Sequence, residues 1–336
     1  MKEISFGPAL RLITRGTYNY YTNRALTVSY EVTHSCTADC RHCDKGGMKP
    51  GEKQLKPEDY RRLQSILKPI VVQISGGEPL TRKDVVEIAK AIKEPNGLPY
   101  LIVVTNGSLL TKEKYLELKE AGVNQFSISL DFPNEKHDEF RRIPGLYKRL
   151  EKLIPELVAF GKDDIVINTA ITSANLHDLR DLYKKAVEWG ISLSVSSYTP
   201  LRTGDPQYCI TGPDDLKLLQ TIMDEFIEIK KTKGNIINSG WTLKGTYEYF
   251  KNGTIPGCKA GLRYLVITPD GKMRPCSMFE KYYGSQKEMI REFVNQNDCG
   301  GCYVAIRAYL DKPYWKLLTD NVQNRVLHRN SKCKNC

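Results

Sequence analysis

The chain has 336 residues, of which 40% are hydrophobic and 26% charged, and its 50 Lys and Arg against 39 Asp and Glu give a formal charge of +11. This length exceeds the size at which one hydrophobic core stops growing, so we expect about two domains. No run of about 18 apolar residues is present, which excludes a membrane-spanning helix, and residues 1–16 lack the features of a secretory signal. We therefore expect a cytoplasmic protein, in which ten cysteines are expected to bind metal or do redox chemistry.

The basic charge is spread along the whole sequence. It favours acidic partners, which include nucleic acid, anionic substrates, membrane headgroups and acidic electron-carrier proteins. A solvated basic surface explains it equally well. No Lys and Arg cluster alternates with aromatic residues, so nothing favours nucleic acid in particular.

Short apolar runs alternate with amphipathic stretches from residue 26 onward. The runs predict strands at 26–33, 70–75, 100–106, 125–131, 165–172 and 191–198. The stretches between them predict helices at 57–68, 82–93, 111–121, 146–160 and 175–189. This order is typical of an α/β fold with a parallel sheet covered on at least one face, in which ligands bind at the carboxyl ends of the strands.

The pattern changes after Gly204. Residues 211–234 predict a long amphipathic helix, and the region beyond it holds six of the ten cysteines. We therefore predict an N-terminal extension at 1–25, an α/β domain at 26–234 and a small cysteine-rich domain at 235–336.

Cys36, Cys40 and Cys43 follow the first predicted strand. A tetrahedral zinc site would need a fourth ligand, for which Asp39, His42 and Asp44 are the local candidates. A [4Fe–4S] cluster held by three thiolates would instead leave one iron open to a substrate or cofactor.

The spacing Cys36-xxx-Cys40-xx-Cys43 resembles the signature of the radical S-adenosylmethionine (SAM) superfamily, whose cysteine loop follows the first strand of a partial (βα)6 barrel. The segments "SGGEPL" (75–80), "TNG" (105–107) and "SISLD" (127–131) are similar to the family's motifs at the next three strand ends. Each segment alone also fits a turn or a helix cap, but their joint order favours the resemblance.

The resemblance implies that S-adenosylmethionine binds at these strand ends. Its amino group would meet the GGE motif, where Glu78 offers a carboxylate, and its nucleoside would meet hydroxyl and carboxylate groups, while His42 would pack on the adenine. The residues expected to bind the cofactor are His42, Gly76, Gly77, Glu78, Pro79, Thr105, Asn106, Ser129, Asp131 and, as a weaker candidate, Asn168. The reduced cluster would cleave the sulfonium to methionine and a 5′-deoxyadenosyl radical, which abstracts hydrogen from the substrate. A flavodoxin or ferredoxin is the expected reductant.

A second set of cysteines resembles the SPASM and Twitch extensions of radical SAM enzymes. Residues 264–276 predict a hairpin with a turn at Pro269-Asp270-Gly271, and "DCGGC" (298–302) adds a CxxC pair. The resemblance implies an auxiliary [4Fe–4S] cluster on Cys258, Cys276, Cys299 and Cys302. Cys299 and Cys302 with Cys333 and Cys336 form a competing set for a cluster or zinc, and Cys333 and Cys336 also suit a second partial cluster or a redox pair. Cys209 is isolated, which predicts a packed thiol without a chemical role.

The substrate class stays open between a small metabolite, a lipid precursor and a peptide. The 25 residues before the first strand are too short for a peptide-recognition domain, which makes a ribosomal peptide less expected. Arg142, Arg202 and Arg307 are candidate anchors for an anionic substrate, although solvated surface explains them equally. Two rival functions are an iron–sulfur electron-transfer or sensing protein without turnover, and a zinc-stabilised nucleic-acid-binding protein.

Overall fold

The computed structural model describes residues 6–161 and 163–320, and in them one curved sheet has the strand order β6-β5-β4-β3-β2-β1-β7-β8. The strands are β1 (Thr27–Thr33), β2 (Val71–Gly76), β3 (Tyr100–Thr105), β4 (Gln125–Ser129), β5 (Ile165–Ile171), β6 (Ser192–Ser197), β7 (Tyr264–Ile267) and β8 (Met273–Arg274). All neighbouring pairs from β6 to β7 are parallel, and the β7–β8 pair is antiparallel. The six strands expected from the sequence are confirmed, and so is the hairpin.

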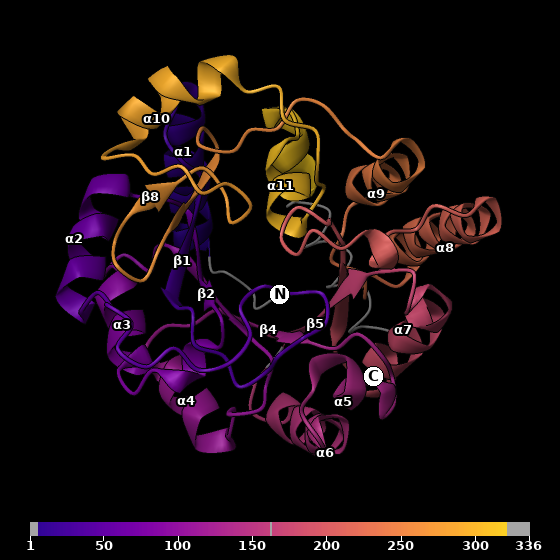
Figure 1. Cartoon of the computed structure of the whole chain (residues 1–336). Coiled ribbons are helices and arrows are strands. Elements are labelled where there is room, and N and C mark those ends of the chain that lie inside the picture. Colours follow the sequence, from indigo (N-terminus) through magenta and orange to yellow (C-terminus); the bar gives the residue numbers. More distant parts are fainter. Residues whose placement is uncertain (1–5, 162, 321–336) are drawn as a thin grey trace.

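The helices lie mainly outside the curve of the sheet, as Figure 1 shows. Their bounds are α1 (Phe6–Tyr21), α2 (Pro57–Leu67), α3 (Val85–Ile92), α4 (Lys112–Glu120), α5 (Lys136–Arg141), α6 (Leu146–Val158), α7 (Leu179–Glu188), α8 (Pro213–Thr232), α9 (Gly240–Asn252), α10 (Gln286–Glu292) and α11 (Ala305–Leu310). Helices α2 to α4 and α6 to α8 correspond to the predicted ones. The C-terminal segments, with α10 and α11, lie across the side of the ring that the barrel strands leave open.

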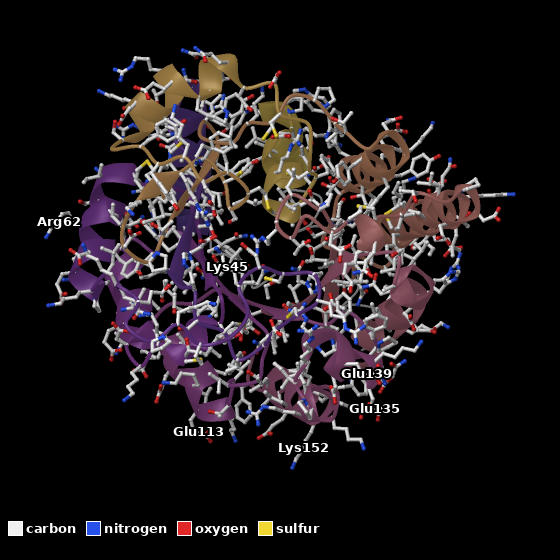
Figure 2. All side chains as sticks on the ribbon, viewed as in Figure 1. Lys45, Arg62, Glu113, Glu135, Glu139 and Lys152 are labelled. Atoms are coloured by element: carbon white, nitrogen blue, oxygen red, sulfur yellow. The ribbon has the colours of Figure 1, made fainter. Side chains whose placement is uncertain are left out.

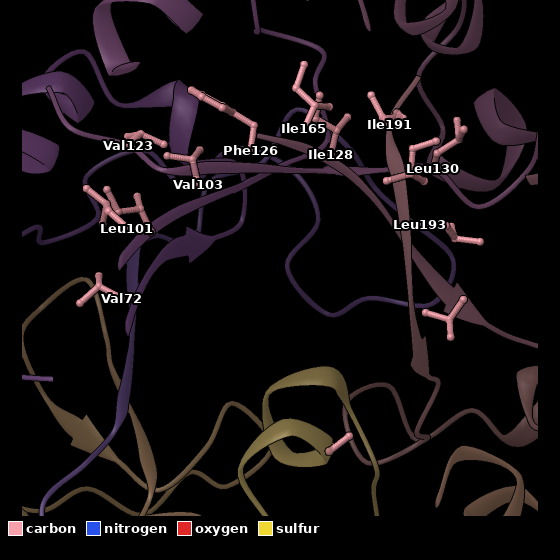
Figure 3. Packing of buried hydrophobic residues seen from close by; sticks show 14 of the residues in the cluster. Val72, Leu101, Val103, Val123, Phe126, Ile128, Leu130, Ile165, Ile191 and Leu193 are labelled. Carbon is pink, nitrogen blue, oxygen red and sulfur yellow. The ribbon is translucent and has the colours of Figure 1, made fainter. Parts of the chain in front are cut away.

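The side chains of each barrel strand alternate between an apolar outer face and a more polar inner face. On β4, Phe126 and Ile128 are fully buried against the helices, and Figure 3 shows them on the convex side of the sheet. Ser127 and Ser129 alternate with them and therefore face the inside. The inner face carries polar groups on β1 and β2 as well, where Ser29 and Ser75 share a hydrogen bond of 2.8 Å. The predicted apolar runs thus describe the outer face, while the inner face offers hydrogen-bonding groups.

The prediction of a partial (βα)6 barrel is confirmed, and helices α1, α5 and α9 to α11 are additional to the predicted set. Helix α1 is fixed to the barrel, because Arg15 donates two hydrogen bonds to Glu94, at 2.7 and 2.9 Å. No helix among residues 6–161 and 163–320 is long and apolar enough to cross a membrane.

The cysteine-rich region continues the barrel sheet, because β7 pairs in parallel with β1. A buried ion pair reinforces this junction: Arg274 of β8 donates to the Glu31 carboxylate of β1 at 2.6 Å, and Ser277 donates to the same carboxylate at 2.7 Å. The hairpin is therefore held on the barrel by both backbone and charged contacts. The division of the chain at residue 235 stays a prediction.

Candidate active site

Cys36, Cys40 and Cys43 lie on a loop after β1, at the carboxyl edge of the sheet. The Cys36 and Cys40 side chains are buried and Cys43 is half-buried. The loop closes on itself, since the Cys36 N–H donates to Gly47 O at 2.9 Å and the Gly47 N–H donates to Ala38 O at 3.1 Å. The fold thus gathers the three thiols at the edge where the sequence places a ligand site.

Each of the three thiols is approached by one N–H donor from another part of the barrel. Asn106 Nδ2, after β3, lies 3.7 Å from Cys36 Sγ. A guanidinium nitrogen of Arg141, at the end of α5, lies 3.8 Å from Cys40 Sγ. A guanidinium nitrogen of Arg202, after β6, lies 3.8 Å from Cys43 Sγ.

Hydrogen bonds to the sulfurs are one of the means by which a protein sets the reduction potential of an iron–sulfur cluster. Burial also raises the pKa of the Cys40 thiol to about 11, although the charge of Arg141 acts in the opposite direction. A bound metal deprotonates such a thiol outright, so these donors and this burial fit a cluster of thiolate-ligated iron.

Two of the three residues considered as a fourth zinc ligand pair with cations, whereas His42 Nδ1 is buried without a hydrogen-bond partner among the residues that the structure describes. Asp39 pairs with Arg142, and Asp44 lies within 3.6 Å of Lys45 Nζ and 3.4 Å of Arg202 Nε.

The His42 ring stacks on Phe140, with the ring centroids 4.7 Å apart and the planes 9° from parallel. Its burial, together with the charge of Arg141, lowers the pKa of His42 to about 4. The ring is therefore neutral at pH 7. Its predicted contact with adenine stays a prediction.

Glu78 connects the ends of β2 and β3. Its fully buried carboxylate accepts hydrogen bonds from Thr105 Oγ1 at 2.8 Å, from the Asn106 N–H at 2.7 Å and from the Leu80 N–H at 3.0 Å. Burial raises the pKa of this carboxyl group, while the three donors lower it by a smaller amount. The structure thus joins the predicted residues Glu78, Thr105 and Asn106 in one network. The predicted contact between Glu78 and an ammonium group stays a prediction.

The glycines before Glu78 allow two backbone segments to touch. A Cβ atom at Gly76 would lie 2.1 Å from Thr33 O, and one at Gly77 would lie 2.3 Å from Ser35 O. The N–H groups of Gly77 and Glu78 donate to these same two oxygens, both at 2.8 Å. The binding of the cofactor by these glycines stays a prediction. In the structure they let the β2 end support the cysteine loop, and buried Pro79 then begins a short 3-10 turn, Pro79–Thr81.

The predicted residues on β4 and β5 lie at different depths. Ser129 and Asn168 are paired in the sheet register and both are half-buried, and their contact with the cofactor stays a prediction. Asp131 is fully buried, and its carboxylate accepts from Arg141 at 2.7 Å and from the Ala170 N–H at 3.2 Å. Asp131 therefore fixes Arg141 against Cys40. Its predicted contact with the nucleoside stays a prediction.

Charged side chains also face the inside of the barrel. Figure 2 shows Lys45 near the centre of the ring, whereas Arg62, Glu113 and Lys152 lie at its periphery. Glu31, on the inner face of β1, is 3% exposed. Burial alone would raise the pKa of Glu31, but the hydrogen bond with His34 and the charges of Arg274 and Lys45 lower it to about 2. The interior thus holds ionised groups of both signs.

The second set of cysteines gathers in the cysteine-rich region. Cys258, Cys276 and Cys299 contact one apolar cluster that includes Tyr264 and Leu310. Burial raises the pKa of the Cys276 thiol to about 12, and repulsion from Cys302, Cys258 and Cys299 contributes to the rise. The four thiols are therefore near enough to interact electrostatically.

Two side chains hold the segments that carry these thiols. Asn297 donates to Cys258 O at 2.9 Å and accepts from the Cys299 N–H at 3.2 Å. Arg307 donates to Cys302 O, to Ile255 O at 2.5 Å and to the Asp311 carboxylate at 2.7 Å. Arg307 is fully buried, so the interpretation of Arg307 as solvated surface is wrong. Its place in the apolar stretch "CYVAIRAYL" (302–310) is the sequence signal that indicates burial.

No group of three or more His, Cys, Asp or Glu side chains within the described ranges 6–161 and 163–320 is arranged to hold a single metal ion. A [4Fe–4S] cluster needs a wider arrangement of cysteines than a single metal ion, because each of its irons binds its own thiolate. Cys333 and Cys336 lie outside the described residues. Cys209 is half-buried against Phe132, Phe140, Tyr198 and Tyr208, apart from both sets.

Comparisons with known proteins agree with this geometry. Residues 30–186 match the family model described as the radical SAM superfamily. The AdoMet-dependent heme synthase of Methanosarcina barkeri (strain Fusaro / DSM 804) is 29% identical over 289 residues, which cover 80% of this chain and 81% of the relative. Among solved structures, Streptococcus suis SuiB bound to its precursor peptide SuiA is 20% identical with a TM-score of 0.63, and the match covers 93% of this chain and 76% of SuiB.

Native anSMEcpe with bound AdoMet is 17% identical with a TM-score of 0.61, and the match covers 91% of this chain and 99% of anSMEcpe. These two structures share the fold with this chain. Since the family model begins within β1 and includes the cysteine loop and the strand ends up to α7, the match coincides with the site described above. Residues 30–186 of this chain thus carry a radical SAM superfamily domain, and the chain is an enzyme similar to the AdoMet-dependent heme synthase.

Proposed function

We propose that this enzyme binds a [4Fe–4S] cluster at Cys36, Cys40 and Cys43 and cleaves S-adenosylmethionine there to initiate radical chemistry on an organic substrate. One observation carries the proposal: the three thiols lie on one loop and each meets an N–H donor from another part of the barrel, while Asp39 and Asp44 pair with cations. A cluster held in this way keeps one iron open. The cluster, when bound, supplies the electron that splits the sulfonium and yields the 5′-deoxyadenosyl radical that abstracts hydrogen from the substrate.

The residues of this chain would position the reactants and exclude water. Gly76 and Gly77 hold the end of β2 against the cysteine loop, and Glu78 fixes the ends of β2 and β3 to each other. Ser129 and Asn168 present polar groups on the inner face, where they can donate to and accept from the ribose and the carboxylate of the cofactor. Such preorganisation lowers the entropic cost of reaction in the site.

We assign an auxiliary cluster to Cys258, Cys276, Cys299 and Cys302, within a cysteine-rich unit at 235–336. The repulsion that Cys276 experiences from Cys258, Cys299 and Cys302 and the apolar cluster that Cys258, Cys276 and Cys299 share support the assignment. Four protein thiolates leave no open iron, so this cluster would transfer electrons instead of binding substrate. It would accept the electron released when a substrate radical is oxidised.

The substrate would be an organic molecule with polar or charged groups. The inner face carries Lys45, Glu31 and Arg274, together with strand serines, and ionised groups of both signs suit a polar ligand. The AdoMet-dependent heme synthase and SuiB, which is bound to a precursor peptide, differ widely in the molecules named with them. A small metabolite, a lipid precursor and a peptide therefore all stay within the proposal.

The proposal is tested by anaerobic reconstitution with iron and sulfide. We expect a brown protein that converts S-adenosylmethionine to methionine and 5′-deoxyadenosine when dithionite is added, measured by liquid chromatography. A colourless protein that contains zinc and no iron would support the rival nucleic-acid-binding function. An iron–sulfur protein that leaves S-adenosylmethionine intact would support the electron-transfer or sensing function.

The reductant would be an acidic one-electron carrier such as a flavodoxin or ferredoxin, because the chain carries a formal charge of +11. We expect the rate of cluster reduction by such a carrier to fall as ionic strength rises from about 0.01 M to about 0.15 M, over which the Debye length shortens from about 30 Å to about 8 Å. Stopped-flow absorbance measures this rate, and reduction by dithionite corrects for any effect of salt on the cluster itself. A rate that is indifferent to salt would argue against electrostatic docking.

A further inference from the structure

Arg202 lies on a tight turn that follows β6. The Gly204 N–H donates to Pro200 O at 2.7 Å and the Thr203 N–H donates to the same oxygen at 3.2 Å. Gly204 has φ = +72°, a conformation that glycine adopts without strain. The Tyr198 hydroxyl lies 2.8 Å from Thr203 Oγ1 and holds the turn on its other side. Arg202 is therefore presented by a well-fixed segment of backbone.

The Arg202 guanidinium reaches into the first cysteine site. One of its nitrogens lies 3.8 Å from Cys43 Sγ, and its Nε lies 3.4 Å from Asp44 Oδ1. The side chain is only 22% exposed, so the interpretation of Arg202 as solvated surface is wrong. A positive charge is thus held beside the least buried of the three thiols.

The same turn is attached to the second cysteine site. Thr199 Oγ1 donates to Gly301 O at 2.9 Å, and the Tyr249 hydroxyl donates to the same oxygen at 3.1 Å. Leu201 packs on Gly301, where a Cβ atom would lie 3.1 Å from the Leu201 side chain. Since Gly301 lies between Cys299 and Cys302 in the sequence, the turn at 199–204 connects the two sets of thiols.

We propose that Arg202 is a positioning residue that raises the reduction potential of the cluster at Cys36, Cys40 and Cys43, and that the contacts of its turn with Gly301 keep it in place. Reduction adds one negative charge to the cluster, so a cation beside a ligating sulfur stabilises the reduced form more than the oxidised form. The inference rests on the proposed function, because it requires a cluster at these three cysteines.

The test is a redox titration of the full, reconstituted chain without S-adenosylmethionine, followed by electron paramagnetic resonance. The signal of this cluster is the one that disappears when Cys36, Cys40 and Cys43 are replaced together by alanine. We expect Arg202→Gln to make the cluster about tenfold harder to reduce, which is a shift of about 59 mV to lower potential for one electron. Arg202→Lys should retain most of the wild-type potential, because it keeps the charge.

Two further variants locate the effect. Thr199→Val removes the hydrogen bond to Gly301 and should shift the potential in the same direction by a smaller amount. Arg62→Gln is the control, because Arg62 is exposed on α2 at the periphery of the ring and its loss removes the same charge, and it should leave the potential unchanged. If Arg202→Gln does not retain the cluster, the comparison of Arg202→Lys, Thr199→Val and wild type decides the question.

An unchanged potential in Arg202→Gln with full iron content would overturn the inference. Weaker binding of S-adenosylmethionine with an unchanged potential would also overturn it and assign Arg202 to cofactor binding. If the wild-type chain has no signal that depends on the three cysteines, the proposed function itself fails, and this outcome is distinct from a failure of the role of Arg202.

Discussion

Replacing Cys36, Cys40 or Cys43 singly by alanine is expected to abolish the formation of 5′-deoxyadenosine while the fold is retained. Each thiol would ligate a different iron. With only two thiolates, the site could not hold a [4Fe–4S] cluster in which a single iron is open. Iron analysis should show the loss of this cluster and the retention of iron at the second set of cysteines. Liquid chromatography after addition of dithionite and S-adenosylmethionine measures the loss of cleavage.

Cys209→Ala is the matched control for these variants. Cys209 is half-buried like Cys43, but it packs against Phe132, Phe140, Tyr198 and Tyr208 and belongs to neither set of cysteines. We expect wild-type iron content and cleavage in this variant. Full cleavage activity in any of the three alanine variants at the site would contradict the assignment of the open iron.

The outer layer of the fold could be predicted from the sequence because its signals are local. The apolar runs that precede residues such as Gly76 and Asn106 mark the strands, and amphipathic stretches mark the helices between them. The cysteine spacing and the strand-end motifs mark the edge of the sheet where the site lies. Each of these signals occupies a few consecutive residues.

The supporting contacts of the site could not be predicted in the same way, because they join segments far apart in the chain. Arg141 meets Cys40 across 101 positions, and Arg202 meets Cys43 across 159 positions. Gly77 is predicted to bind the cofactor, but its close approach to the chain's own residues His34 and Ser35 could not be predicted. A sequence shows that a glycine is needed but not which atom approaches it.

The sequence also left two ligand sets for the auxiliary cluster, and the structure gives a reason to prefer one. Cys299 contacts the same apolar cluster as Cys258 and Cys276, and Cys302 acts electrostatically on Cys276. Asn297 also ties the backbone of Cys258 to that of Cys299. The hairpin β7–β8 brings Cys276 to this place, because Cys276 follows β8 by two positions. If Cys258, Cys276, Cys299 and Cys302 are the four ligands, the effects of substitutions distinguish this set from the one that includes Cys333 and Cys336.

Replacing Cys299 and Cys302 together by alanine is expected to remove the auxiliary cluster and to spare the formation of 5′-deoxyadenosine, since the cluster at Cys36, Cys40 and Cys43 has its own ligands. Formation of product from any substrate that the wild-type enzyme converts should be abolished, because the electron released from the substrate radical would have no acceptor. Iron content, electron paramagnetic resonance and chromatography of both products measure these effects.

Cys333→Ala with Cys336→Ala distinguishes the competing ligand sets in the same measurements. Loss of the auxiliary cluster in this variant would show that the terminal pair ligates it, against the assignment to Cys258 and Cys276.

Product formation that survives the replacement of Cys299 and Cys302 would refute the electron-transfer role, because turnover would then proceed without the cluster. Since Gly301 also contacts the turn of Arg202, a modest change in the potential of the first cluster is expected in the Cys299 and Cys302 variant, whereas loss of all cleavage would mean that the two sites cannot form independently.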